Sequence, residues 1–144
     1  MKTDSKNFLY KLSSLRKSAF SFLEEEMSKS GITDVPPSFG DILYIIHNKG
    51  AGYVKDIVES SYKDKSTISN IINQLEKKGY VDKIPDADDG RRVKVRLTDQ
   101  ARKYIDEMAD ISARLQNKLF ENMSDEEQEI MFLLINKVEK NLVL

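Results

Sequence analysis

The sequence predicts a mainly α-helical fold with one small β-hairpin. Through most of the 144 residues, apolar side chains recur every three or four positions, which is the spacing of one helix face. After Gly79 the period changes to two, because Val93, Val95 and Leu97 alternate with cationic residues, as in a strand with one exposed face. Apolar residues make up 40% of the chain, and it has six glycines and three prolines, so we expect a single folded domain over residues 1–144.

Three helices are predicted in the first part of the chain. The first begins near Phe8 and ends before Gly31, because glycine commonly follows the last turn of a helix. Its apolar face is formed by Phe8, Leu12, Leu15, Ala19, Phe22 and Met27. The Pro36–Pro37 pair suits the first turn of a second helix, which ends before Gly50. A short third helix, near Val54 to Ser60, has room for about two turns.

The segment from Asp64 to Lys78 is predicted to be a helix with a polar, uncharged face. Asp64 lies where an N-cap is expected, and Gly79 follows the last turn as a helix-ending glycine. One apolar stripe is formed by Ile68, Ile71, Ile72 and Leu75. The other faces carry uncharged hydrogen-bonding side chains: Ser66, Thr67, Ser69, Asn70, Asn73 and Gln74. A solvated helix surface usually carries Glu and Lys, so this composition favours a surface that recognises a partner.

A hairpin and two long helices complete the predicted elements. The hairpin has a first strand near Val81 to Ile84, a polar loop from Asp86 to Gly90 and a second strand over residues 93–97. Thr98 caps a long helix that carries an apolar stripe. The run Ser124-Asp125-Glu126-Glu127 is a capping box, which opens the last helix.

Composition excludes several classes of function. The chain has no cysteine and a single histidine, His47, which excludes disulfides, thiol chemistry and a histidine pair for zinc. The longest apolar run, Ile130 to Ile135, is far shorter than the ~20 residues that cross a bilayer. The first residues lack the apolar segment of a signal peptide. We therefore expect a cytoplasmic protein with no metal, no cofactor, no membrane association and no enzymatic activity.

The order of the elements predicts a winged helix-turn-helix over residues 36–97. In this fold one helix enters the major groove of DNA, where its side chains must donate to and accept from base edges. The hairpin loop ends in Arg91 and Arg92, which are placed to reach phosphates or a narrow minor groove. The candidate DNA-binding residues are Lys63, Lys65, Ser66, Thr67, Ser69, Asn70, Asn73, Arg91 and Arg92. The alternative is that both arginines are loop charges that only keep the protein soluble.

The helices at both ends of the chain predict a homodimer. Apolar stripes in residues 5–30 and 99–142 lie outside the winged unit and would stay partly exposed in a monomer. Pairing two copies buries these stripes and sets two DNA-reading helices about one duplex turn apart. The predicted architecture is therefore a winged helix-turn-helix flanked by N- and C-terminal dimerisation helices.

Four short segments carry a family signature. They are Asp64-Lys65-Ser66-Thr67-Ile68-Ser69, Leu75-Glu76-Lys77-Lys78-Gly79-Tyr80-Val81, Asp89-Gly90-Arg91 and Val95-Arg96-Leu97-Thr98. In this order and spacing they resemble the MarR family of bacterial transcriptional regulators, over roughly residues 53–104. The chain departs from the family pattern at Asn70 and Lys83, where arginine is common, and at Ala101, where glycine is usual.

The resemblance implies a role for each part of the chain. The helix over 64–78 enters the major groove, Arg91 enters the minor groove, and Asp89 holds that arginine. The family forms homodimers through its terminal helices and binds pseudo-palindromic operators, usually as repressors that small, often phenolic, ligands release. Its effector pocket lies between the dimerisation helices and the DNA-binding unit. Candidate effector-binding residues there are Tyr10, Arg16, Tyr44 and His47.

The effector assignment has an alternative for each residue type. Aromatic residues at helical spacing, such as Tyr10 and Tyr44, are more often part of a core. A histidine near a helix end, such as His47, more often bonds a backbone carbonyl.

The sequence thus predicts a transcriptional regulator that binds double-stranded DNA sequence-specifically, as a homodimeric repressor released by a small aromatic or phenolic effector. A winged-helix module that docks a protein partner through the same face, without direct DNA binding, is the alternative. The salt dependence of binding distinguishes the two, because neutralised phosphates release counterions.

Overall fold

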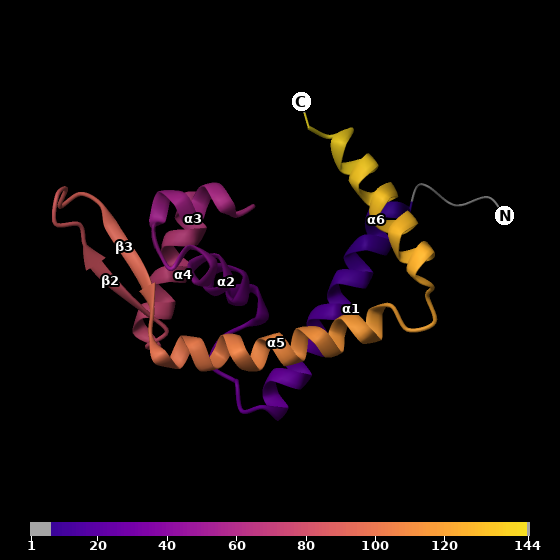
Figure 1. Cartoon of the computed structure of the whole chain (residues 1–144), viewed down its shortest axis with the longest axis horizontal. Helices are drawn as coiled ribbons and strands as arrows, with labels where there is room; N and C mark the ends of the chain where they lie inside the picture. The colour runs from indigo at the N-terminus through magenta and orange to yellow at the C-terminus, as the bar shows by residue number, and fades with distance from the viewer. Residues whose placement is uncertain (1–6, 144) are drawn as a thin grey trace. The chain divides into compact units, whose positions relative to one another are not determined.

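The computed structural model describes residues 7–143 of the chain, and Figure 1 shows its helices and strands. In chain order the elements are α1 (Phe8–Lys29), the 3₁₀ helix η2 (Pro37–Phe39), α2 (Gly40–Lys49), β1 (Ala51–Tyr53), α3 (Val54–Ser60), α4 (Lys65–Lys77), β2 (Val81–Pro85), β3 (Val93–Leu97), α5 (Asp99–Leu119) and α6 (Asp125–Lys140). The mainly helical fold with a small antiparallel sheet is confirmed.

The chain divides into two compact units, up to Ser112 and from Ala113 onward, so the boundary lies within α5. The sequence predicted a single domain, and it remains a prediction that the two units act as one. The division into the winged unit 36–97 and the dimerisation helices also remains a prediction.

The first unit contains the hydrophobic core. The core collects the apolar faces of α2 and α4, the inner face of the sheet and the first turns of α5. Its largest fully buried side chains are Met27, Ile42, Leu43, Ile46, Ile57, Ile68, Ile72, Leu75, Val81, Val95 and Ile111. The predicted stripe of α4 is therefore confirmed as the buried face of that helix, which leaves the opposite face in contact with solvent.

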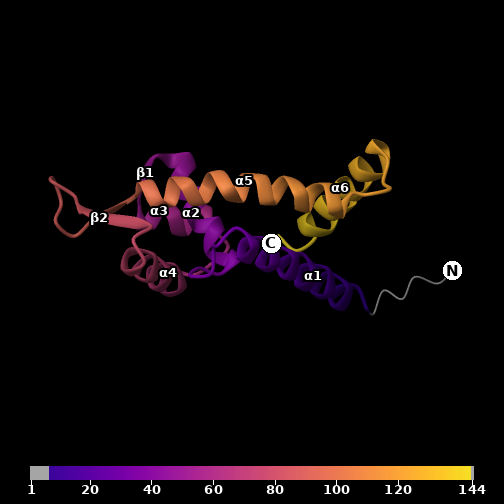
Figure 2. The same ribbon diagram turned by 90° about the horizontal axis from the view of Figure 1, so that it is seen from below.

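Three antiparallel strands form the sheet, in the order β1-β3-β2. β3 alternates as predicted from Val95 to Leu97, because Val95 and Leu97 are buried while Arg96 is exposed, whereas Val93 and Lys94 are both half-buried. Arg96 lies opposite Asp82 of β2 and its Nε is 3.5 Å from an Asp82 carboxylate oxygen. The loop that joins β2 to β3 lies at the end of the sheet away from α5 in both views (Figures 1 and 2). We call the β2–β3 hairpin the wing and residues 86–92 the wing loop.

Two features differ from the sequence-based expectation. The second helix was expected to begin at the proline pair, but Pro37 starts the short η2 and α2 begins at Gly40. The strand β1 was not predicted, because three residues are too few to show a period of two. It exists through pairing with β3, in which Gly52 lies opposite Val95.

Both ends of α4 are fixed by local hydrogen bonds. At its start, the Thr67 N–H donates to the Asp64 carboxylate over 2.7 Å, which confirms the predicted N-cap. At its end, the Tyr80 N–H donates to the Leu75 carbonyl over 2.9 Å and Gly79 has a φ of +82°, as in a helix-ending motif that places glycine in the left-handed region.

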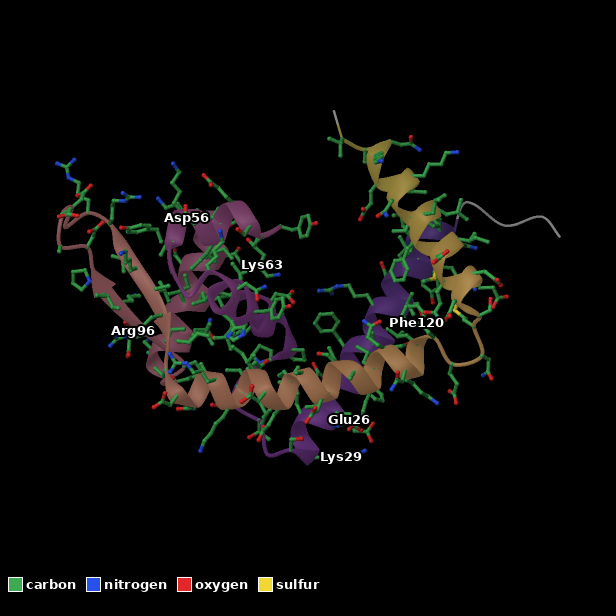
Figure 3. The ribbon with its side chains drawn as sticks, viewed as in Figure 1. Glu26, Lys29, Asp56, Lys63, Arg96 and Phe120 are labelled. Carbon is green, nitrogen blue, oxygen red and sulfur yellow. The ribbon has the colours of Figure 1, made fainter. Side chains whose placement is uncertain are left out.

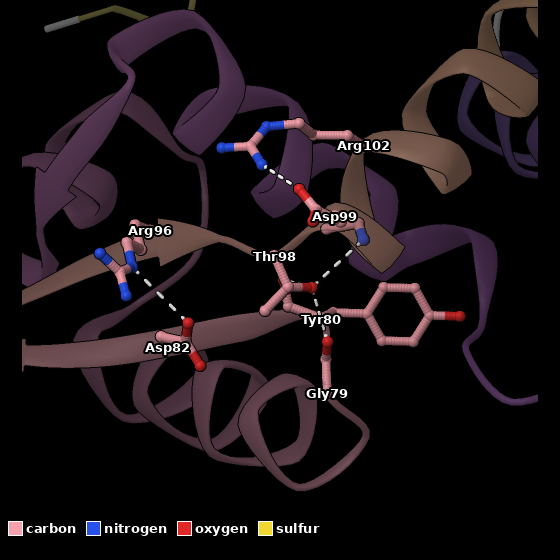
Figure 4. Close-up of polar contacts among 8 residues, drawn as sticks. Gly79, Tyr80, Asp82, Arg96, Thr98, Asp99 and Arg102 are labelled. Carbon is pink, nitrogen blue, oxygen red and sulfur yellow. Dashed lines mark hydrogen bonds and ion pairs between the residues drawn. The ribbon is translucent and has the colours of Figure 1, made fainter.

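Thr98 joins the end of α4 to the start of α5 (Figure 4). Its hydroxyl donates to the Gly79 carbonyl over 2.6 Å, and the same oxygen accepts the Ala101 N–H over 3.3 Å. The predicted cap of α5 is confirmed, and this cap also contacts the turn that follows α4. In the same view the Arg102 guanidinium pairs with Asp99 over 2.7 Å in the first turn of α5.

Two buried tyrosines lie beside this junction. The rings of Tyr80 and Tyr104 meet edge to face, with their centroids 5.6 Å apart. The Tyr80 hydroxyl donates to an Asp34 carboxylate oxygen over 2.9 Å, and burial together with this carboxylate raises the pKa of Tyr80 to about 12. Burial also raises the pKa of Tyr104, whose hydroxyl has no hydrogen-bond partner within the described residues. Both rings are therefore neutral packing elements that hold α5 against the start of β2.

We expect Gly79→Ala to lower the free energy of unfolding by about 1–2 kcal/mol, because an L side chain is strained at positive φ. An added Cβ would also lie 3.0 Å from the Gln100 side-chain oxygen. Denaturant unfolding of the two proteins measures the difference. Gly90→Ala is the matched control, since a Cβ there meets no atom within 4 Å. Equal losses for both variants would contradict the assignment of strain to Gly79.

The second unit contains the end of α5 and all of α6. Ser124 and Glu127 form the predicted capping box, with reciprocal bonds of 3.2 Å and 2.9 Å. Phe120 and Phe132 pack with ring centroids 5.8 Å apart, but no side chain is buried between residues 113 and 143. Exposed apolar residues on α6 are Ile130, Phe132, Leu133, Leu134, Ile135 and Val138. Among the helices of residues 7–143, none combines the length and apolar character needed to span a membrane.

Candidate nucleic-acid interface

The exposed face of α4 carries the uncharged polar residues that the sequence singled out. Ser66, Thr67 and Asn70 are exposed, and Ser69 is half-buried. Asn73 is also exposed, but its side-chain carbonyl accepts a hydrogen bond from the Lys83 ammonium group of β2. Asn73 is therefore oriented by the wing, while its amide nitrogen keeps its capacity to donate.

Two lysines flank the first turn of α4. Lys63 is half-buried in the connection after α3, where its N–H donates to the Ser61 hydroxyl over 3.2 Å (Figure 3). Lys65 is exposed and is the first residue of α4. Cations at this end oppose the helix macrodipole. Phosphate groups near the same end would instead interact favourably with the lysines and with the exposed N–H groups.

Asp64 gives this cap a pH dependence. The bond from the Thr67 N–H lowers the pKa of Asp64 below the ordinary value of an aspartate, so the cap is ionised at neutral pH. Because the folded-state pKa is lowered, the stabilisation is present above the unfolded-state pKa and is lost as pH falls through the folded-state pKa. We expect the stability difference between the wild type and Asp64→Ala to be constant above about pH 5 and to shrink below about pH 4. Urea unfolding at several pH values measures it. A difference that persists unchanged to about pH 2 would contradict this role.

The wing loop is held by its own backbone and carboxylates. The Asp86 N–H donates to the Arg92 carbonyl over 3.1 Å and the Arg92 N–H to the Asp89 carbonyl over 3.0 Å. Asp89 also accepts the Arg91 N–H on its carboxylate, over 3.0 Å. The resemblance implied that Asp89 holds Arg91. In the structure the contact is to the backbone of Arg91, and within the described residues no ion pair joins the two side chains, so Asp89 shapes the turn and leaves the guanidinium exposed.

Arg92 is placed differently from Arg91. Its guanidinium carbon lies 4.0 Å from the centre of the Tyr53 ring, and the Lys94 ammonium nitrogen lies 5.3 Å from the same ring centre. Tyr53 was not among the residues that the sequence predicted for the site. It lies 33 positions before Asp86, the first residue of the wing loop, so no local pattern signals its contacts with the wing.

The wing and the helices α3 and α4 enclose a shared hollow of about 450 Å³. Its lining combines apolar residues, Val54, Val58 and Val93, with charged ones that are mostly cationic, Lys55, Lys65, Arg91 and Arg92 beside Glu59. The structure thus brings together two groups of predicted residues, the start of α4 and the wing arginines. A concave surface with mostly cationic charges suits an anionic partner.

The four candidate effector residues lie on two helices. Tyr10 and Arg16 are on α1, whereas Tyr44 and His47 are on α2, and all four are exposed. Tyr10 is 74% and Tyr44 59% exposed, so neither ring belongs to the core of the single chain. The Arg16 guanidinium lies 4.4 Å from the Phe20 ring centre, and His47 lies in the last turn of α2. No hydrogen bond, ion pair or ring contact between residues 7 and 143 joins the α1 pair to the α2 pair.

Comparison with known proteins decides the family. The model of the MarR family matches residues 37–93. The regulator SarZ of Staphylococcus aureus is 31% identical over 101 residues, which are 69% of this chain and 67% of SarZ. The chain belongs to the MarR family. MarR proteins are transcriptional regulators and not enzymes.

Other MarR relatives match over a smaller share of their length. The uncharacterized HTH-type regulator YwaE of Bacillus subtilis is 36% identical over 70% of this chain. The matched region covers 59% of YwaE and 64% of the regulator PecS of Dickeya dadantii.

Solved MarR-type structures share the fold. A MarR protein from Peptoclostridium difficile has a TM-score of 0.83 at 24% identity, covering 99% of this chain and 91% of its own. A mutant MarR from E. coli complexed with operator DNA has a TM-score of 0.79 at 20% identity, covering 94% and 99%. BpsR of Bordetella bronchiseptica, whose DNA binding is regulated by 6-hydroxynicotinic acid, has a TM-score of 0.79 at 19% identity, covering 96% and 97%. The winged helix-turn-helix predicted from the sequence is confirmed.

Proposed function

We propose that this MarR-family chain binds double-stranded DNA sequence-specifically through α4 and the wing. The observation that carries the proposal is the exposed, uncharged face of α4 around Thr67 and Asn70, in the same unit as the exposed Arg91. An asparagine can bond adenine with two hydrogen bonds, and hydroxyl groups serve as donor or acceptor to any base edge. Arginine on a hairpin loop reaches phosphates or the minor groove. The operator-bound MarR of E. coli, which shares the fold, supports this assignment.

We propose further that the protein is a cytoplasmic homodimer that represses transcription by occupying a pseudo-palindromic operator. The apolar side chains that α1 and α6 expose support dimerisation, because association would remove them from water. Two symmetry-related copies of α4 then read two half-sites about one helical turn of DNA apart.

We also propose that a small aromatic or phenolic effector releases the DNA. The support is the group of exposed aromatic and cationic side chains on α1 and α2, namely Tyr10, Arg16, Tyr44 and His47. BpsR, whose fold matches, responds to an aromatic acid. Titration of the protein–DNA complex with a panel of phenols and aromatic acids, followed by fluorescence anisotropy, tests this part of the proposal. A complex that no member of the panel dissociates would count against it.

A protein-docking module is the second candidate function. The observation in its favour is the apolar part of the lining of the hollow, namely Val54, Val58 and Val93. A surface that binds a peptide through such a lining gains its free energy from apolar burial and depends little on salt.

Selection from a library of random DNA duplexes, performed with the full chain, distinguishes the two functions. DNA binding predicts enrichment of one sequence with two related half-sites. On that duplex, log affinity falls with log salt concentration by about 0.9 for each phosphate neutralised. Unenriched DNA and a flat salt dependence would contradict DNA recognition and favour protein docking.

A further inference from the structure

Tyr53 connects the helix-turn-helix to the wing. It is the last residue of β1 and immediately precedes α3. Its backbone is therefore connected to the sheet on one side and to α3 on the other. It lies opposite Lys94 in the pairing of β1 with β3. A side chain at this position is therefore fixed relative to both parts of the candidate interface.

The Tyr53 hydroxyl bonds the first residue of the wing loop. It donates to an Asp86 carboxylate oxygen over 2.8 Å, while the other carboxylate oxygen of Asp86 accepts the Asp88 N–H over 3.1 Å. The Asp88 N–H and then the Tyr53 hydroxyl lower the pKa of Asp86, so this carboxylate is ionised at neutral pH and acts as an acceptor for both. The Asp86 N–H also closes the loop against the Arg92 carbonyl.

The Tyr53 ring contacts the last residue of the wing loop. The Arg92 guanidinium lies over the ring, with 4.0 Å between its central carbon and the ring centre, which is cation–π geometry. Tyr53 therefore contacts both ends of the loop, Asp86 through its hydroxyl and Arg92 through its ring. Arg91 lies next to the second of these contacts, and its N–H is held by Asp89.

We propose that Tyr53, Asp86 and Arg92 form a clamp that positions Arg91 for DNA, so that Arg92 acts as a positioning residue and not as a phosphate contact. This inference rests on the proposed DNA-binding function and assigns the two wing arginines different parts in it. Tyr53 and Asp86 are positioning residues in the same sense, because they act through Arg91.

The variants separate the two contacts of Tyr53. Tyr53→Phe removes the hydroxyl bond and keeps the ring, Tyr53→Leu removes both, and Arg92→Ala removes the cation from the ring. Tyr62→Phe is the matched control, because Tyr62 belongs to the same unit and its side chain is fully exposed. Each variant is measured for hydrogen exchange at the Asp86 and Arg92 amides and for affinity to the selected duplex at several salt concentrations. Thermal unfolding confirms that each variant is folded.

We expect Tyr53→Leu to speed exchange at both amides and to weaken duplex binding on the order of tenfold, with a smaller effect for Tyr53→Phe and none for Tyr62→Phe. In the Tyr53→Leu background, adding Arg91→Ala should weaken binding less than about threefold, because an arginine that is not positioned contributes little to the affinity for DNA. Arg92→Ala should weaken binding while the salt slope stays unchanged, whereas the loss of a phosphate contact lowers the slope by about 0.9.

Three results would overturn the inference. The first is a wild-type affinity for Tyr53→Leu combined with faster exchange in the wing loop, which leaves the DNA-binding function standing and removes the clamp from it. The second is a full effect of Arg91→Ala in the Tyr53→Leu background. The third is a lower salt slope for Arg92→Ala, which makes Arg92 a phosphate contact. A wild-type chain that selects no duplex removes the proposed function itself, and the clamp's role with it.

Discussion

Leu134→Arg is expected to dissociate the proposed homodimer and to weaken binding to the proposed operator by about 10²- to 10⁴-fold, which is the usual gain in affinity from two linked binding sites over one. Leu134 is 52% exposed and lies on the apolar stripe that continues to Ile130 and Val138, one turn to either side. In the proposed dimer this stripe would be buried, and an unpaired guanidinium placed there would lose its hydration without gaining a partner. Twofold symmetry introduces the charge twice.

Leu134 is a better position for this test than Leu115, because its side chain is more exposed in the single chain. Leu115 on α5 is part of the predicted dimerisation stripe as well, but it is half-buried within the chain, so Leu115→Arg would disturb the monomer and the dimer together. Light scattering gives the mass of the variant, and fluorescence anisotropy gives its affinity for the selected duplex. Glu139→Arg, on another face of α6, is the control and should remain dimeric. A dimer of unchanged mass for Leu134→Arg would place the interface elsewhere.

Arg91→Ala is expected to weaken operator binding by about 1–3 kcal/mol and to leave the fold and the dimer intact. The Arg91 side chain is exposed, and the Asp89 carboxylate bonds only the backbone N–H of Arg91. Removing the guanidinium therefore breaks no contact on which the fold depends. The whole effect should therefore appear in the complex with DNA.

Arg102→Ala is the matched control for Arg91→Ala. Arg102 is also exposed and lies in the same unit, but its guanidinium pairs with Asp99 at the start of α5. Both variants lose one positive charge, so a general electrostatic effect would lower the affinity of both. An affinity equal to that of the wild type for Arg91→Ala would remove the wing loop from DNA recognition.

The helices could be predicted from the sequence because their signals are local. The Asp64 cap, the glycine after α4 and the Ser124 capping box each depend on residues within a few positions, and each is confirmed. The apolar stripe of α4 fixed which face is buried, and hence which polar residues remain exposed. The start of α2 was wrong by one turn, because a proline pair is compatible with a 3₁₀ turn as well as with an α-helix.

The parts of the site that could not be predicted depend on contacts between distant residues. β1 is defined by its partner strand, and Tyr53 reaches Asp86 across 33 positions of sequence. The resemblance paired Asp89 with Arg91, and the structure shows a contact between the Asp89 carboxylate and the Arg91 backbone N–H. Sequence alone does not distinguish such a backbone contact from an ion pair. The exposure of Tyr10 and Tyr44 was likewise not readable from helical spacing, since exposed and buried aromatic residues recur at the same intervals.

Thr98 has a consequence for how such a protein responds to a signal. One hydroxyl bonds both the carbonyl after α4 and the first turn of α5. A shift of the first turn of α5 would therefore be passed to the turn after α4 through a connection only two hydrogen bonds long. In the proposed homodimer, the angle between subunits and the separation of the two DNA-reading helices would then change in step.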